Sequence, residues 1–399
     1  MNIAKELIRE LWSYNKLAII LVLVEMSKAV GFISTAPDSI VYLAILIFAF
    51  TCCNNIEKFE TSIILLLLYI PLEILLANPD PLFKSWYRYL GFVLGFLAVS
   101  PLIQSEKARL LRKQALLSLA IVSTILSIIS FFCYFLGINF MRAGMYDTVY
   151  QAGTFGGLFR QSMLLGPIAG FASVFTSYNA HIKKRKEYWV LSIMCIGAVL
   201  FSASRSALMA TIAGNVVMLY FGSKGKSRFI KTIMIITLLA SVTFPLWEDA
   251  TQLVLEKQAN NTASGSMLMS RETKWINRID EFKSSPLWGV GFSSVDVSYT
   301  GDYLPHNGQI EPGSSWLVII SMLGIIGALI ILPIFMTCYK ANKNMNDDIS
   351  ALYLGLLALI AIHMVAEGYI FASGGFLFFM MWLIISVAFD QKYNNINMQ

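Results

Sequence analysis

Residues 301–332 read GDYLPHNGQIEPGSSWLVIISMLGIIGALIIL, and within this stretch a polar segment turns into a long apolar one. About 20 apolar residues, at roughly 1.5 Å each, cross the hydrocarbon core of a bilayer as a helix that satisfies its own backbone hydrogen bonds. The second half of the stretch therefore predicts a membrane span. Its first half places His306, Asn307 and Glu311 where that span leaves the bilayer.

The rest of the chain has the same apolar character. Of its 399 residues, 57% are hydrophobic and 14% are charged, which leaves too little polar surface to cover a water-soluble protein of this size. The sequence predicts an all-α polytopic integral membrane protein with about twelve transmembrane helices. The expected spans are 16–35, 39–53, 62–77, 86–104, 115–138, 161–180, 187–203, 205–222, 229–247, 314–338, 349–366 and 371–389.

Three densely basic loops set the expected orientation. They read SEKARLLRKQ (105–114), HIKKRKEY (181–188) and GSKGKSRFIK (222–231). Cytoplasmic loops of membrane proteins carry an excess of Lys and Arg, so these loops predict the cytoplasmic side, and with twelve spans both termini lie there. The net charge of +6 is then mostly this signal, and we expect no nucleic-acid partner.

We expect a single transmembrane domain, residues 1–399, with a smaller external loop at 139–160 and a larger one at 248–313. The larger loop holds nine Asp or Glu and five Lys or Arg, as expected on the external side. Loops of this length are usually functional or disordered. The pattern of its residues 270–282 predicts a helix, which argues against disorder.

The predicted loop helix has two neighbouring stripes. Arg271, Lys274 and Arg278 fall on one side of it, beside an aromatic and apolar stripe that begins with Trp275. Such a helix suits a membrane interface, with its cations reaching lipid phosphates. It equally suits a solvated helix packed on the core of the loop, and the pattern leaves both interpretations open.

His306 is a candidate general base, because histidine exchanges a proton near neutral pH. Asn307 and Glu311 would fix its tautomer or bind sugar hydroxyls. A purely structural histidine is the alternative. His363 and Glu367, four residues apart near the end of a span, are a second candidate, with an internal hydrogen bond between helices as the alternative.

External arginines predict a phosphate site, since a guanidinium matches phosphate oxygens and stays charged. Arg205, in LFSASRSALMA (200–210), and Arg160 are expected at external ends of spans. Each could instead reach lipid headgroups without a substrate. Together with Arg271 and Arg278, they would form a site for a lipid-linked diphosphate. Since no metal-ligand spacing is evident, we expect a site without metal or cofactor.

Several of these motifs occur together in one known family. The SxSR turn, RETKW, SPLWGVGF, PHN and LGIIG follow one another here. In this order they resemble the Wzy-type O-antigen polymerases and O-antigen ligases, over about residues 150–390. The resemblance implies a membrane-glycosyltransferase (GT-C-like) fold in the bacterial cytoplasmic (inner) membrane, with the large loop in the periplasm. It also implies metal-independent transfer of a polysaccharide from undecaprenyl diphosphate, in lipopolysaccharide biosynthesis.

The resemblance assigns catalytic roles to Arg205, Arg271 and His306. Such polymerases also carry two external Arg-x10-Gly motifs, and here Arg142 precedes Gly153 while Arg278 precedes Gly289 at that spacing. This favours an O-antigen polymerase, for which the resemblance implies a chain-length regulator as partner. An O-antigen ligase that transfers the polymer to lipid A core remains an alternative. A flippase for lipid-linked oligosaccharide is a third, although the chain shows no internal repeat.

Overall fold

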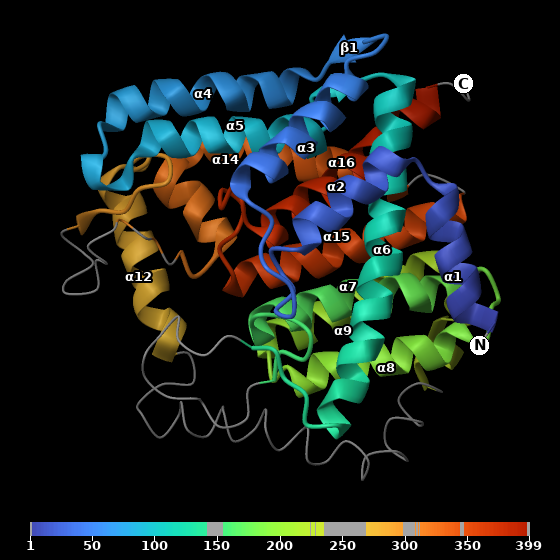
Figure 1. Cartoon of the computed structure of the whole chain (residues 1–399). Coiled ribbons are helices and arrows are strands. Elements are labelled where there is room, and N and C mark those ends of the chain that lie inside the picture. The colour runs from blue at the N-terminus through green and yellow to red at the C-terminus, as the bar shows by residue number, and fades with distance from the viewer. Residues whose placement is uncertain are drawn as a thin grey trace.

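The structure is a computed structural model that describes residues 2–141, 155–223, 225–227, 229–234, 269–297, 308, 310, 312–343 and 347–396. These residues are mostly helical (Figure 1). The helices are α1 (Asn2–Ser13), α2 (Lys16–Met26), α3 (Asp38–Cys52), α4 (Thr61–Ala77), η1 (Pro81–Phe83), α5 (Ser85–Val99), α6 (Glu106–Phe135), α7 (Ser162–His181), α8 (Tyr188–Phe201), α9 (Arg205–Gly222), α12 (Met269–Ser284), α14 (Ser315–Lys343), α15 (Asp348–Ala366) and α16 (Phe376–Ile396). Two short strands, β1 (Lys58–Phe59) and β2 (Ile103–Gln104), pair antiparallel.

The helices confirm an all-α membrane protein. Eleven of the twelve expected spans overlap a described helix, and the remaining one, 229–247, lies largely outside the described residues. Among the described helices, four are long and apolar enough to cross a membrane by length and composition: α6, α14, α15 and α16. The total of about twelve spans stays a prediction.

The first span is shorter than expected. The sequence predicts a helix to residue 35, but α2 ends at Met26. The chain after it leaves the helix because it pairs with a distant segment: Val30 forms a β-bridge with Phe159, and the amide of Gly31 donates to the carbonyl of Leu158 at 2.7 Å. The expected span therefore combines a short helix with an extended segment.

The interior is built around α15 and α16. Figure 1 shows them between α4 and α5 on one side and α7, α8 and α9 on the other. The window of α16 that is apolar enough to span a membrane is 83% buried within the protein. Its Trp382 is fully buried and donates from Nε1 to the carbonyl of Ile370 at 3.1 Å. The centre of the bundle is thus packed with side chains.

Helices α9 and α15 run antiparallel and meet at glycines. A Cβ added to Gly214 would lie 3.0 Å from the carbonyl oxygen of Gly355, and one added to Gly222 would lie 3.5 Å from the Cβ of Ala351. Small residues of this kind let helix backbones approach closely in membranes. The contacts fix the register of the two helices, which decides what lies at their ends.

Helix α14 is interrupted at Gly324, which has φ 64° and ψ −167°. The loop after α12 fills the break: the amide of Val290 donates to Ser321 O at 2.9 Å, and that of Ile325 donates to Pro286 O at 2.9 Å. Broken helices are tolerated at membrane depth where other protein groups satisfy the freed backbone. The loop motif SPLWGVGF and the helix motif LGIIG therefore form one structural unit.

Candidate functional site

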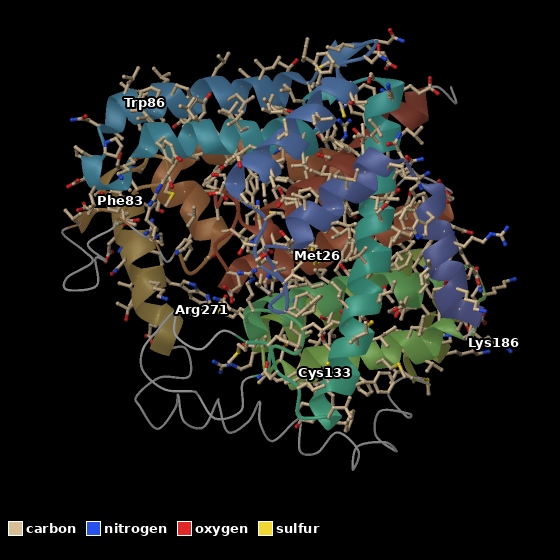
Figure 2. All side chains as sticks on the ribbon, viewed as in Figure 1. Met26, Phe83, Trp86, Cys133, Lys186 and Arg271 are labelled. Atoms are coloured by element: carbon tan, nitrogen blue, oxygen red, sulfur yellow. The ribbon has the colours of Figure 1, made fainter. Side chains whose placement is uncertain are left out.

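The predicted loop helix is present as α12, and it packs against α14. We call the end of the molecule where α12 meets the last turn of α15 the α12 end. There Arg271 forms an ion pair with Glu367 and donates to the carbonyl of Ala366 and, at 3.3 Å, to that of Gly313. A cation is favoured at this position because the C-terminus of a helix carries partial negative charge. Figure 2 shows Arg271 on the side of α12 that faces the bundle.

The start of α14 is fastened to the same place. Ser315 donates from Oγ to the carbonyl of Glu367 at 2.7 Å and accepts from the amide of Tyr369 at 3.0 Å. Trp275 of α12 donates from Nε1 to the carbonyl of Gly313 at 3.2 Å. The segment that directly follows the predicted site residue Glu311 is therefore held between α12 and the end of α15.

The expected pairing of His363 with Glu367 takes a different form. His363 is 1% exposed, and its Nδ1 lies 3.1 Å from the hydroxyl of Tyr369, whereas the carboxylate of Glu367 meets Arg271. The two residues share only the backbone hydrogen bond from the amide of Glu367 to His363 O. The alternative of an internal hydrogen bond describes His363, whereas Glu367 is partly exposed at the α12 end.

Arg278 does not face lipid phosphates, contrary to the expected basic stripe. It is 3% exposed and forms an ion pair of 2.9 Å with Glu281, while the other oxygen of that carboxylate accepts from the amide of Asp296 at 3.0 Å. Burial raises the pKa of Glu281 and lowers that of Arg278, because both charged forms lose solvation. Helix α12 therefore packs against the bundle through α14, which neither interpretation from the sequence specified, and Arg278 is buried there.

Arg160 also makes internal contacts. It is 9% exposed, and its guanidinium donates to the carbonyls of Val30 at 2.6 Å and Ile33 at 3.0 Å. These bonds hold the extended segment after α2 on the start of α7. These contacts give Arg160 a structural role, and its role as a substrate ligand stays a prediction.

Arg205 is the first residue of α9 and is partly exposed. Gly214 of α9 contacts Gly355 of the antiparallel α15, so the two glycines lie at the same level. Arg205 is nine residues before Gly214, and Met364 is nine residues after Gly355. Equal rises along the two helices place Arg205 at the level of the last turn of α15. Arg271 binds that same turn, so the structure brings these two predicted site residues to one end of the bundle.

Four predicted site residues lie outside the described residues: His306, Asn307, Glu311 and Arg142, the last together with Gly153 of its motif. Their roles remain predictions. Gly289, in the second such motif, has φ +87° and lies so close to Met322 that a Cβ would be 2.2 Å from its carbonyl oxygen. The motif thus begins at Arg278, in a buried ion pair, and ends at Gly289, where the loop after α12 contacts the backbone at the break in α14.

Two charged residues of the α12 end were missed or left unassigned. Arg88 of α5 donates to the carbonyl of Gly308 at 2.6 Å and to both oxygens of Ser293 at 3.2 Å. Glu73 of α4 is fully buried and accepts from the amide of Phe292 at 2.8 Å. Both stand within apolar runs, where an ionisable residue signals an internal partner. The sequence therefore indicates that such residues have partners, but which groups these are can be seen only in the folded structure.

Comparison with known proteins gives one finding. A family model described as O-antigen ligase matches residues 190–332, which include Arg205, α12 and the interrupted part of α14. No curated protein matches the chain. The match confirms the predicted resemblance to the O-antigen ligase and polymerase family. That family is enzymatic, of the glycosyl-transfer type, and the match does not distinguish a polymerase from a ligase.

Proposed function

We propose, from the match of residues 190–332 to the O-antigen ligase family, that this chain polymerises O-antigen or related polysaccharide repeat units carried on undecaprenyl diphosphate. The reaction takes place at the periplasmic face of the bacterial inner membrane, with both termini in the cytoplasm and about twelve spans in a GT-C-like arrangement. The observation that carries the proposal is the placement of Arg205 and Arg271 at one end of the bundle, within the matched residues.

The proposed chemistry is a displacement at the anomeric carbon of the donor sugar. A hydroxyl of the acceptor forms the new glycosidic bond, and the bond to the diphosphate breaks. Negative charge builds up on the leaving phosphate, so fixed cations in a partly dry site stabilise the transition state. Arg205 is the main diphosphate ligand in this proposal. Arg271 attracts phosphate less, because Glu367 already balances its charge.

His306 acts as the general base that accepts the proton of the acceptor hydroxyl, with Asn307 and Glu311 as its neighbours. General-base help contributes on the order of 10² to 10⁴ in rate, and leaving-group stabilisation is at least as large. Loss of Arg205 is therefore expected to reduce transfer at least as much as loss of His306. No metal or cofactor is needed in this scheme, because the leaving group is already a stable anion.

An O-antigen ligase is the second candidate, and the description of the matched family favours it. A glycan gel of a deletion strain separates the two. A single repeat unit on core lipid identifies a missing polymerase. Bare core lipid, with polymer retained on undecaprenyl diphosphate, identifies a missing ligase.

The same strain tests the site. Wild type, Arg205→Ala and His306→Ala are expressed in it, with the membrane level of each checked on a blot. Wild type restores the ladder of chain lengths, and both variants fail to restore it. A full ladder from both variants would refute the proposed site, and an unchanged ladder in the deletion strain would refute the function.

A further inference from the structure

Helix α1 has one face buried on the bundle and one apolar face turned outward. On the inner face Leu7 is 2% exposed, and Ile3 and Leu11 pack beside it on the core. On the outer face Ile8 and Trp12, one turn apart, are 47% and 62% exposed. Tryptophan is enriched where a protein meets the membrane interface, because its ring is apolar and its N–H is polar.

Cations border this outer face. Lys5 and Arg9, also one turn apart, are exposed beside the stripe of Ile8 and Trp12. Lys16, at the start of α2, has its Nζ 4.7 Å from the centroid of the Trp12 ring and donates to the carbonyl of Trp12 at 2.6 Å. The exposed indole is therefore surrounded by positive charge.

The acidic residues of α1 are engaged within the protein. Glu10 accepts from the hydroxyl of Tyr14 at 2.7 Å. Glu6 forms an ion pair with Arg185, whose two terminal nitrogens donate to its two carboxylate oxygens. Both carboxylates are only partly exposed. The fully exposed charges of the helix are thus those of its cations.

The ion pair of Glu6 with Arg185 adds a second basic segment, 179 positions away in the chain. Arg185 lies in the loop between α7 and α8, and the lysines on either side of it are exposed. Figure 2 shows Lys186 beside the beginning of α1. We call the exposed cations of the two segments the α1 basic face: Lys5, Arg9, Lys183, Lys184 and Lys186.

The position of α1 in the fold relates this face to the membrane. A short turn at Tyr14 and Asn15 joins it to α2, which begins the first expected span. Figure 1 shows α1 at the opposite side of the molecule from α12, crosswise to α4 and α15. Amphipathic helices with this placement lie in the plane of the interface, with apolar side chains at the acyl boundary and cations at the phosphates.

We propose that α1 is an interfacial helix and that the α1 basic face binds the phosphate groups of anionic phospholipids. Ile8 and Trp12 enter the boundary between headgroups and acyl chains. A water-soluble protein is the other occupant that such a face can take. The basic charge beside the first span favours the lipid, because anionic headgroups attract cations next to a span. The inference does not depend on the proposed glycosyl transfer.

Lipid binding to the purified full chain in neutral detergent tests the role of the charges. Native mass spectrometry gives the Kd of two probes with identical acyl chains, anionic phosphatidylglycerol and zwitterionic phosphatidylethanolamine. The variant is Lys5→Gln/Arg9→Gln, which retains good helix formers. Lys84→Gln/Lys283→Gln is the matched control, because it removes the same charge from two exposed lysines after η1 and in α12.

Each cation near an anionic lipid surface strengthens binding about fivefold, so the α1 variant should raise the Kd of phosphatidylglycerol about 25-fold. The Kd of phosphatidylethanolamine should not change, and the control should bind both lipids as wild type does. An unchanged Kd of phosphatidylglycerol in the α1 variant would overturn the proposal. An equal rise in the control would also overturn it, because the effect would then come from total charge.

The emission of Trp12 tests which medium the outer face meets. It is obtained in phosphatidylglycerol nanodiscs as the difference between wild type and Trp12→Phe. Brominated acyl chains, which quench rings inside the bilayer, should quench this emission, and water-soluble acrylamide should have little effect. The reverse result would place Trp12 in water, as expected for a surface that binds a soluble protein, and would overturn the proposal.

Discussion

Arg271 of α12 forms an ion pair with Glu367, the residue directly after the last turn of α15, although 96 positions separate them in the chain. Their side chains are 25% and 13% exposed, so the pair lies at the surface of the α12 end and is partly screened by solvent. It fixes a helix of the large loop to the bundle at the level of Arg205. An ion pair formed within the loop alone would not hold α12 against the bundle in this way.

A double-mutant cycle should detect the coupling in this pair. Arg271→Ala, Glu367→Ala and the double variant are compared by thermal unfolding in nanodiscs. We expect a coupling free energy of about 1 kcal/mol, since the pair is partly exposed. The same cycle on Arg278 and Glu281 is the reference. Because that pair is buried, removing one partner alone should cost about 3 kcal/mol, and its coupling free energy should be the larger of the two. Equal coupling in the two cycles would contradict the difference in burial.

The loop after α12 packs tightly into the break in α14, so the stability of the protein should be strongly sensitive to one added methyl group at either glycine of this contact. Gly324→Ala places a Cβ 2.2 Å from Leu287 O and Gly289→Ala one 2.2 Å from Met322 O, both at positive φ. Each substitution should destabilise the protein by about 3 kcal/mol or more. Gly91→Ala is the matched control, because its nearest neighbours are 3.5 Å and 3.6 Å away. Apparent unfolding temperatures check this, and wild-type stability of Gly324→Ala would contradict the break in α14.

The positions of the helices were predictable, because long apolar runs have one stable form in a membrane. The break at Gly324 was not, since the sequence around it is uniformly apolar and the cause lies in the loop at residues 286–291. The end of α2 was missed for a similar reason. The expected span continued through residues 27–35, but Val30 and Gly31 in this segment pair with the chain before α7.

The site was predictable only in part. The sequence identified Arg205, Arg271 and Glu367, which the fold brings to one end. It also identified Arg160 and Arg278, which have internal partners. All five are external charged residues by pattern, and only the fold shows which of them have protein partners; their roles as ligands stay predictions. The open pocket lined by Asn78, Asp80, Ser294 and Asp296 has no local signal, because its walls, the end of α4 and the segment after α12, are distant in sequence.

The buried carboxyl of Glu281 predicts an unusual pH dependence. Burial raises its pKa in the folded protein. Between about pH 4.3, the unfolded value, and that raised pKa, the folded protein binds more protons than the unfolded chain, so the free energy of unfolding falls as pH rises. Glu281→Gln should remove this fall, measured as the difference in unfolding temperature from wild type across pH. A difference that does not change with pH would contradict it.

Glu57 provides the control of opposite sign. Arg109 donates two hydrogen bonds to it, at 2.9 Å and 3.1 Å, and these hold its pKa below the usual value. The stability from Glu57 is present above about pH 4.3 and is lost as the pH falls through its lowered pKa. It amounts to a few tenths of a kcal/mol, roughly, because the carboxylate is half exposed. Glu57→Gln should therefore lower the free energy of unfolding by this small, constant amount in the neutral range and change its pH dependence only in acid.

Arg88→Lys tests how the segment carrying His306 is held. The guanidinium of Arg88 reaches Gly308 with one nitrogen and Ser293 with another, whereas the compact ammonium of lysine does not reproduce this fork. We expect glycan transfer to fall about tenfold, because small displacements of a catalytic group are costly. Arg109→Lys, which breaks a forked pair with Glu57 away from the α12 end, should transfer at the wild-type rate. Transfer is measured in membranes with matched protein levels, and full activity of Arg88→Lys would show that this tie does not position the base.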